Sequence, residues 1–128
     1  METRKRILVV EDDDVARELM RRALERQGYE VGMAADGIEG YDAACDKPPD
    51  LIVTDVNMPA ADGAHFVRRV RDTPELASTP ILVTTGYGTG NATFVMSLGA
   101  NAYEPKPIDL HSLLTTVRRL LGIEHQSG

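Results

Sequence analysis

Residues 51–59 read LIVTDVNMP, and this stretch decides the fold. Its first four residues, Leu51–Thr54, form an uninterrupted apolar run that predicts a strand buried on both faces. The run ends at Asp55, and the chain from there to Gly63 is expected to form a loop. A carboxylate in this place lies where ligand chemistry gathers in open α/β sheets.

Strand and helix signals alternate along the rest of the chain. Strands are expected at residues 7–10, 29–34, 51–54, 81–84 and 102–104. Helices fill the intervals between them, and Asn91 and Asp109 are expected to cap the fourth and fifth helices. Five such βα units with continuous apolar strands predict the α/β class, with a parallel sheet covered by helices on both faces.

The expected helices have recognisable ends and inner faces. The first is expected to begin at the N-cap Asp14 and to stop before Gly28, and the second to begin at Asp36. Apolar spacing places the following side chains on inner faces: Val15, Leu19, Met20, Ala23 and Leu24 in the first helix, Ile38, Tyr41 and Cys45 in the second, Phe94, Val95 and Leu98 in the fourth. In the second strand, Val31 and Met33 are expected to point inward.

Length and composition limit the class of protein. A chain of 128 residues fits one domain, here residues 1–128 with a core at about 6–121 and a short tail at 122–128. The net charge of −6 argues against direct nucleic-acid binding. No stretch approaches the ~20 apolar residues of a membrane helix, so no membrane insertion is expected. The single cysteine, Cys45, fits a reducing compartment, and a cytoplasmic location is expected.

Four consecutive acids, Glu11 to Asp14, follow the strand at residues 7–10. A nucleotide-binding domain would carry a glycine-rich turn there. Four carboxylates repel a phosphate unless a divalent cation intervenes, and such oxygen ligands suit Mg²⁺. Acids also favour the positive end of a helix dipole. That alternative explains Asp13 and Asp14 well but explains Glu11 and Asp12 poorly, so the sequence predicts a metal site.

Two further polar groups are expected at the same edge of the sheet. The strand at residues 81–84 ends in Thr84, and Lys106 stands between Pro105 and Pro107. An aspartate can act as a covalent nucleophile toward phosphorus. A metal, an ammonium and a hydroxyl can then each take one equatorial oxygen of the transition state. The ordinary alternative for Asp55 is an Asx turn after a strand.

Together these pieces resemble the receiver domain of two-component response regulators, including the single-domain chemotaxis regulator. The resemblance covers residues 6–121 and rests on VVEDD at 9–13, DVNMP at 55–59 with DG at 62–63, VT at 83–84, and Tyr103 ahead of KP at 106–107. Each motif alone is weak, whereas their order and spacing are specific. The resemblance implies a flavodoxin-like (βα)5 three-layer sandwich with strand order 2-1-3-4-5.

The resemblance also assigns roles at the site. It makes Asp55 the phosphoacceptor and Lys106 the phosphate-binding lysine, with a cis peptide bond to Pro107. It implies Mg²⁺ as the cofactor. The ligands would be Asp12, Asp55, the backbone carbonyl of Asn57 and, through water, Glu11.

The family's switch pair falls on Thr84 and Tyr103. On phosphorylation the threonine is expected to move toward the phosphoryl group and the ring to turn inward, changing the surface of the fourth helix, fifth strand and fifth helix. A strand-end hydroxyl and a half-buried sheet residue are the ordinary alternatives for these two positions. The implied partners are a histidine kinase or histidine phosphotransfer protein, and an effector or a missing output domain. As an enzyme the domain would catalyse only its own phosphorylation and dephosphorylation.

Three positions depart from the family pattern. Glu11 replaces an aspartate, Thr85 stands where a small residue is usual, and Pro105 removes a backbone donor just before the lysine. Thr85 and Pro105 keep open a receiver-fold interaction module that is never phosphorylated. A phosphatase of the haloacid-dehalogenase type is disfavoured, because its general-acid position is occupied by Asn57.

Overall fold

The computed structural model describes residues 4–56, 63–86, 93–94 and 96–122. The strands of its sheet are β1 (Arg6–Val10), β2 (Glu30–Ala34), β3 (Leu51–Asp55), β4 (Ile81–Thr85) and β5 (Ala102–Pro105). They lie in the order β2-β1-β3-β4-β5, and every neighbouring pair is parallel. The α/β class and the strand order expected from the sequence are therefore confirmed.

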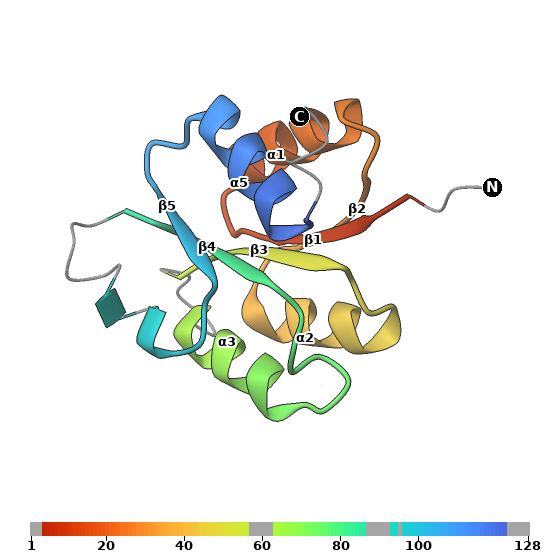
Figure 1. The fold of residues 1–128 in the computed structure, drawn as a ribbon, viewed down its shortest axis with the longest axis vertical. Coiled ribbons are helices and arrows are strands. Elements are labelled where there is room, and N and C mark those ends of the chain that lie inside the picture. Colours follow the sequence, from red (N-terminus) through yellow and green to blue (C-terminus); the bar gives the residue numbers. More distant parts are fainter. Residues whose placement is uncertain (1–3, 57–62, 87–92, 95, 123–128) are drawn as a thin grey trace.

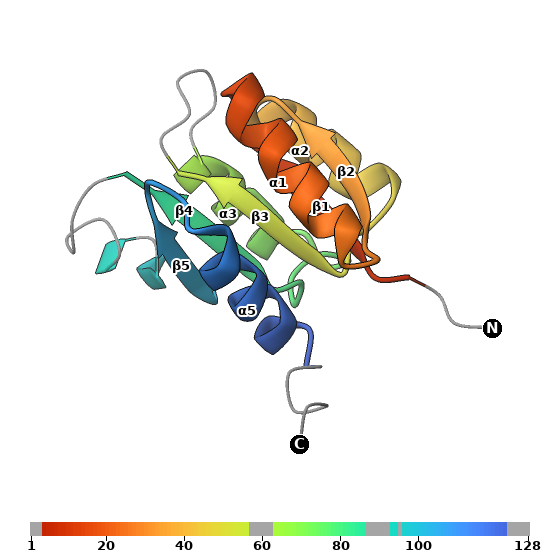
Figure 2. The ribbon, with the colours of Figure 1, turned by 90° about the horizontal axis from the view of Figure 1, so that it is seen from above.

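Helices cover both faces of the sheet. They are α1 (Asp14–Arg26), α2 (Gly37–Asp46), α3 (Gly63–Asp72) and α5 (Leu110–Leu120). Figure 1 shows α1 and α5 on one face and α2 and α3 on the other, and Figure 2 shows the same layers from above. Residues 93–94 and 96–97 are also helical, within the expected fourth helix. Its expected cap Asn91 and its inner residue Val95 lie outside the described residues. Of its other two expected inner residues, Leu98 packs against the core beneath α2 and α3, whereas Phe94 is 51% exposed, so that expectation was wrong.

The strands contribute alternate side chains to two apolar cores. Ile7 and Val9 of β1 belong to the core beneath α1 and α5, whereas Leu8 and Val10 belong to the core beneath α2 and α3. This two-sided burial explains why β1, β3 and β4 are continuous apolar runs rather than alternating ones. The same alternation determines which residues at the strand ends lie on the same face of the sheet, and therefore which side chains can meet in one site.

Two expectations about α1 were wrong. Asp13, not Asp14, is the N-cap, and its side chain accepts the Val15 backbone N–H at 3.2 Å. Val15 and Leu19 are 67% and 52% exposed, and the fully buried residues of the helix are Met20 and Leu24. The face of α1 that packs on the sheet is therefore narrower than the set of apolar residues in the helix, and the outermost of these residues are exposed on the surface.

The inner face of α2 was predicted correctly only at Tyr41, which packs against the core beneath α2 and α3. Ile38 is 54% exposed and Cys45 is exposed, whereas Gly37, Gly40 and Ala44 are buried. A Cβ on Gly40 would stand 2.9 Å from a methyl group of Val10. Because α2 approaches the sheet this closely, small residues must face inward and the larger ones point outward.

The edge strand β2 gives a third correction. Met33 is 45% exposed, although it was expected to point into the core, whereas Val31 packs against the core beneath α1 and α5 as expected. β2 pairs with β1 alone and lies at the border of the sheet, so the layer of helices covers it incompletely.

The remaining helix ends agree with the sequence. Asp36 and Asp109 are N-caps whose carboxylates accept backbone N–H groups of the first helical turns. Gly28 has a φ of +96° just beyond α1, a conformation that favours glycine. None of the helices in the described residues combines the length and apolar character needed to span a bilayer.

Candidate functional site

The carboxyl ends of β1, β3 and β4 bring the candidate residues to one edge of the sheet. Asp55 of β3 pairs in register with Thr84 of β4, and Glu11 directly follows β1. Val53 and Leu82, two residues earlier in β3 and β4, belong to the core beneath α1 and α5. Since side chains alternate along a strand, Asp55 and Thr84 lie on that same face.

Three carboxylates form the floor of the site. One oxygen from each of Glu11, Asp12 and Asp55 lies within 4.8 Å of the others. Glu11 and Asp55 are 1% and 3% exposed, whereas Asp12 is exposed to solvent. The Oε1 atom of Glu11 is buried and has no hydrogen-bond partner in the described part of the chain. A compact set of hard oxygen ligands with an unsatisfied oxygen fits a small divalent cation such as Mg²⁺.

Lys106 completes the charge balance of this cluster. Its Nζ donates a hydrogen bond to Asp55 Oδ2 at 2.9 Å and lies 3.7 Å from Glu11 Oε1. Burial lowers the pKa of Lys106, but the hydrogen bond and charge of Asp55 outweigh that effect and leave the pKa raised. Lys106 is therefore a cation at physiological pH. Its peptide bond to Pro107 is cis, as the resemblance implied.

The buried acid Glu11 is the group most perturbed by this arrangement. Desolvation raises its pKa from 4.5 to about 7, against the lowering effect of a backbone hydrogen bond from Asp13. That N–H donates to Glu11 Oε2 at 3.0 Å. The value of about 7 already includes the charge of Asp55, which raises the pKa, and that of Lys106, which lowers it. Without a cation, the site therefore holds a proton near neutral pH.

The two predicted switch residues lie on opposite faces of the sheet. Thr84 is completely buried, and its Oγ1 has no hydrogen-bond partner in the residues that the structure describes. Tyr103 is 43% exposed and pairs in register with Val83, which belongs to the core beneath α2 and α3. The inward turn of the Tyr103 ring stays a prediction. Asn57, the expected backbone ligand, lies outside the described residues.

Arg17 supports the acidic loop, and the sequence analysis missed it. Its guanidinium donates to the backbone carbonyl of Glu11 at 2.7 Å and also pairs with the Asp14 carboxylate. The spacing of Asp14 and Arg17 indicates a helical ion pair. The bond to the Glu11 carbonyl could not be expected, because it depends on how the loop folds back over the helix.

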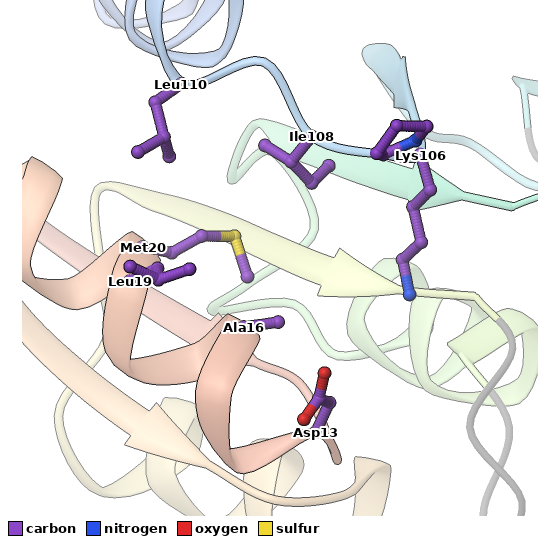
Figure 3. A pocket seen from close by; sticks show the side chains of 8 residues that line it. Asp13, Ala16, Leu19, Met20, Lys106, Ile108 and Leu110 are labelled. Atoms are coloured by element: carbon purple, nitrogen blue, oxygen red, sulfur yellow. The ribbon is translucent and has the colours of Figure 1, made fainter.

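A cavity of about 350 Å³ opens beside the site, between α1 and the β5–α5 connection. It is lined by Asp13, Ala16, Leu19, Met20, Lys106, Pro107, Ile108 and Leu110. Figure 3 shows the Lys106 side chain extending past this cavity toward the end of β3. The cavity is mainly apolar, and exposed Leu19 lines it together with Lys106, whose Nζ contacts Asp55.

Known proteins are similar to this chain in both sequence and fold. Residues 7–118 match the family described as response regulator receiver domain. The response regulator MprA of a Mycobacterium strain is 42% identical over 117 residues, which cover 91% of this chain and 50% of that protein. The chain thus spans about half the length of the curated relatives it matches.

Solved structures agree with the sequence comparison. The chemotaxis response regulator CheY4 of Vibrio cholerae superposes with a TM-score of 0.87 at 34% identity, over 92% of this chain and 99% of that one. The receiver domain of a Pseudomonas aeruginosa sensor histidine kinase, with a magnesium ion coordinated in its active-site cleft, gives 0.87 at 29% identity, over 94% and 99%. The chain belongs to the response regulator receiver domain family of two-component signalling.

Proposed function

We propose that this receiver domain accepts a phosphoryl group on Asp55 and thereby switches a signalling surface. The observation that carries the proposal is the contact of Lys106 Nζ with Asp55 Oδ2, at 2.9 Å, within a cluster of three carboxylates. A buried carboxylate beside a fixed ammonium and an acidic pair has the groups that aspartyl phosphorylation needs.

The chemistry assigns one task to each side chain. An Asp55 oxygen attacks phosphorus, and the bond from phosphorus to the donor breaks with its electron pair leaving on the donor. Lys106 exchanges its bond to Asp55 for one to a phosphoryl oxygen, and the buried Thr84 hydroxyl, which has no hydrogen-bond partner among the described residues, can donate to another. Mg²⁺, held by Asp12, Asp55 and the Asn57 carbonyl with Glu11 reaching it through water, would neutralise the developing charge.

The donor in this proposal is a histidine kinase or a histidine phosphotransfer protein, and the domain works as a cytoplasmic switch. It has no separate substrate to turn over and catalyses only its own phosphorylation and dephosphorylation. Movement of Thr84 toward the phosphoryl group, coupled to the ring of Tyr103, would change the surface of the fourth helix, β5 and α5. The partner that binds this surface is an effector protein or an output domain. An output domain is included because the curated relatives are about twice as long as the matched region.

Intact mass after incubation with acetyl phosphate tests the proposal. Wild type with Mg²⁺ is expected to gain the mass of one phosphoryl group, and wild type with a chelator is expected to gain nothing. Asp55→Asn is expected to remain unmodified, whereas Asp42→Asn, at an exposed aspartate of α2, is expected to react like wild type. An unmodified wild type that still binds Mg²⁺ would favour an interaction module. The observation that supports an interaction module is Thr85, which is buried beside Thr84 at a position where the family usually has a small residue.

The apolar surface beside the site predicts how a protein donor differs from a small one. Leu19 is 52% exposed at the cavity beside Lys106, so Leu19→Glu is expected to slow transfer from a histidine kinase by about tenfold. Its rate with acetyl phosphate should match wild type, because a small donor needs no docking surface. Ile38→Glu, at a residue 54% exposed on the opposite layer, is the matched control. Equal slowing by both variants would rule out this surface.

A further inference from the structure

A buried acid outside the carboxylate cluster is unused by this chemistry. Glu104 of β5 is 7% exposed, and its two carboxylate oxygens accept hydrogen bonds from two hydroxyl groups of α5. Ser112 Oγ donates at 2.9 Å and Thr116 Oγ1 at 2.7 Å. Glu104 makes no ion pair with any residue in the described part of the chain. The carboxylate is therefore held by two hydroxyls that stand one helical turn apart.

The position is costly for an acid. The neighbouring side chains of this core, among them Ala102, Leu113 and Val117, are apolar. Moving a carboxylate from water into such surroundings costs free energy, and an apolar residue would avoid that cost. The acid makes this contact directional. Its two charge-assisted hydrogen bonds form in only one alignment of α5 along β5, whereas apolar contacts alone would tolerate small shifts of the helix along the strand.

The same bonds close the connection that carries Lys106. Glu104 and Ser112 stand on either side of residues 105–111, and their side chains join the two ends of this segment at 2.9 Å. Ser112 is also held at its backbone, where its N–H donates to Asp109 Oδ1 at 3.2 Å. The Lys106 backbone N–H donates to the Thr85 carbonyl at 2.8 Å. The segment is thus tied to the sheet on one side and to α5 on the other.

We propose that Glu104, held by Ser112 and Thr116, is a positioning residue for Lys106. It sets where the connection leaves β5 and enters α5, and so keeps Lys106 Nζ within reach of Asp55 Oδ2. The effect of Glu104 on phosphoryl transfer rests on the proposed function, whereas its effect on the position of Lys106 is independent of that function. Glu104 itself touches neither the acceptor carboxylate nor the metal cluster.

The scarcity of lysine allows a direct test. Lys5 and Lys47 are exposed and lie far along the chain from this connection, so they serve as internal references for Lys106. Amine labelling followed by peptide mass spectrometry on the metal-free protein reports how well Lys106 is held by Asp55. Asp55→Asn, which removes the charge partner, is the positive control for a released Lys106.

Three kinds of variant separate positioning from simple packing. Glu104→Leu removes both hydrogen bonds and puts an apolar side chain in the place of the acid. The triple variant Glu104→Leu/Ser112→Ala/Thr116→Val also removes the two hydroxyls that Glu104→Leu leaves without their acceptor, so it serves if the single variant does not fold. Both are expected to raise Lys106 labelling several-fold relative to Lys5 and Lys47. Glu104→Gln keeps hydrogen-bonding groups at both positions and is expected to stay close to wild type. Thr115→Ala removes an exposed hydroxyl that bonds only within α5, at 3.0 Å to the His111 carbonyl, and should change nothing.

Phosphorylation gives the second readout. The variants that release Lys106 are expected to react with acetyl phosphate about tenfold more slowly at saturating Mg²⁺. Their Mg²⁺ affinity should not fall below that of wild type, because Lys106 competes with the cation for the Asp55 carboxylate and its release removes that competition. Unchanged Lys106 labelling in folded Glu104→Leu or in the folded triple variant would overturn the proposal. A wild type that takes no phosphoryl group would instead overturn the proposed function, and the labelling would still decide the role of Glu104.

Discussion

Gly63→Ala is expected to lower the free energy of unfolding by about 3 kcal/mol or more and to suppress the proposed phosphorylation of Asp55. Gly63 is the buried first residue of α3. A Cβ there would lie 2.1 Å from the backbone oxygen of Asp55 and 2.5 Å from Cα of Val56. Both are backbone atoms, so no side-chain rotation can relieve the contact. Either α3 moves off the sheet or the end of β3 shifts, and the Asp55 carboxylate shifts with it.

The sign of this effect is informative. The φ of Gly63 is not in the left-handed region, so the backbone alone would accept alanine, which normally stabilises a helix by about 0.5–1 kcal/mol relative to glycine. Gly32→Ala in β2 is the matched control, because its nearest neighbour, at 2.5 Å, is the flexible guanidinium of Arg6. Urea unfolding of both variants gives the comparison. A Gly63→Ala protein as stable as wild type would show that α3 does not press on the β3 end.

The strand pattern could be predicted because each buried strand is a separate apolar run. Two-sided burial leaves a signal that depends on no other part of the chain, and parallel βα units then bring the strand ends to one edge. The sequence could therefore predict which charged residues gather at this edge, since each of them stands at or just beyond the end of a strand: Glu11, Asp12, Asp55 and Lys106. The strand order itself came from the resemblance to receiver domains.

The faces of the helices could not be predicted in the same way. Ile38 and Cys45 have the spacing of an inner face, but the distance from α2 to the sheet is set by Gly40 against Val10. That distance is a property of two elements and not of the helix sequence alone. Glu104 is a similar case, because an acid in a short edge strand gives no sign that two hydroxyls of a later helix will bind it.

Glu11→Gln is expected to remove a pH dependence that the metal-free wild type shows. The folded protein keeps a proton on Glu11 up to about pH 7, whereas the unfolded chain loses it near pH 4.5. Between these values the folded state binds more protons, so its stability falls as the pH rises. The slope is about 1.4 kcal/mol per pH unit, and the total fall is on the order of 3 kcal/mol. Below this interval the contribution of Glu11 is fully present.

Urea unfolding with a chelator, from about pH 5 to pH 8, measures this dependence as the difference between the variant and wild type. The subtraction removes the titration of the histidines, which both proteins share. Glu75→Gln, at an exposed acid, should follow the wild-type curve. Mg²⁺ should abolish the fall in wild type, because a cation at the cluster favours the charged carboxylate and its binding expels the proton. Parallel curves for wild type and Glu11→Gln would mean that Glu11 is already ionised in the metal-free protein, and that its negative charge is balanced without a bound proton.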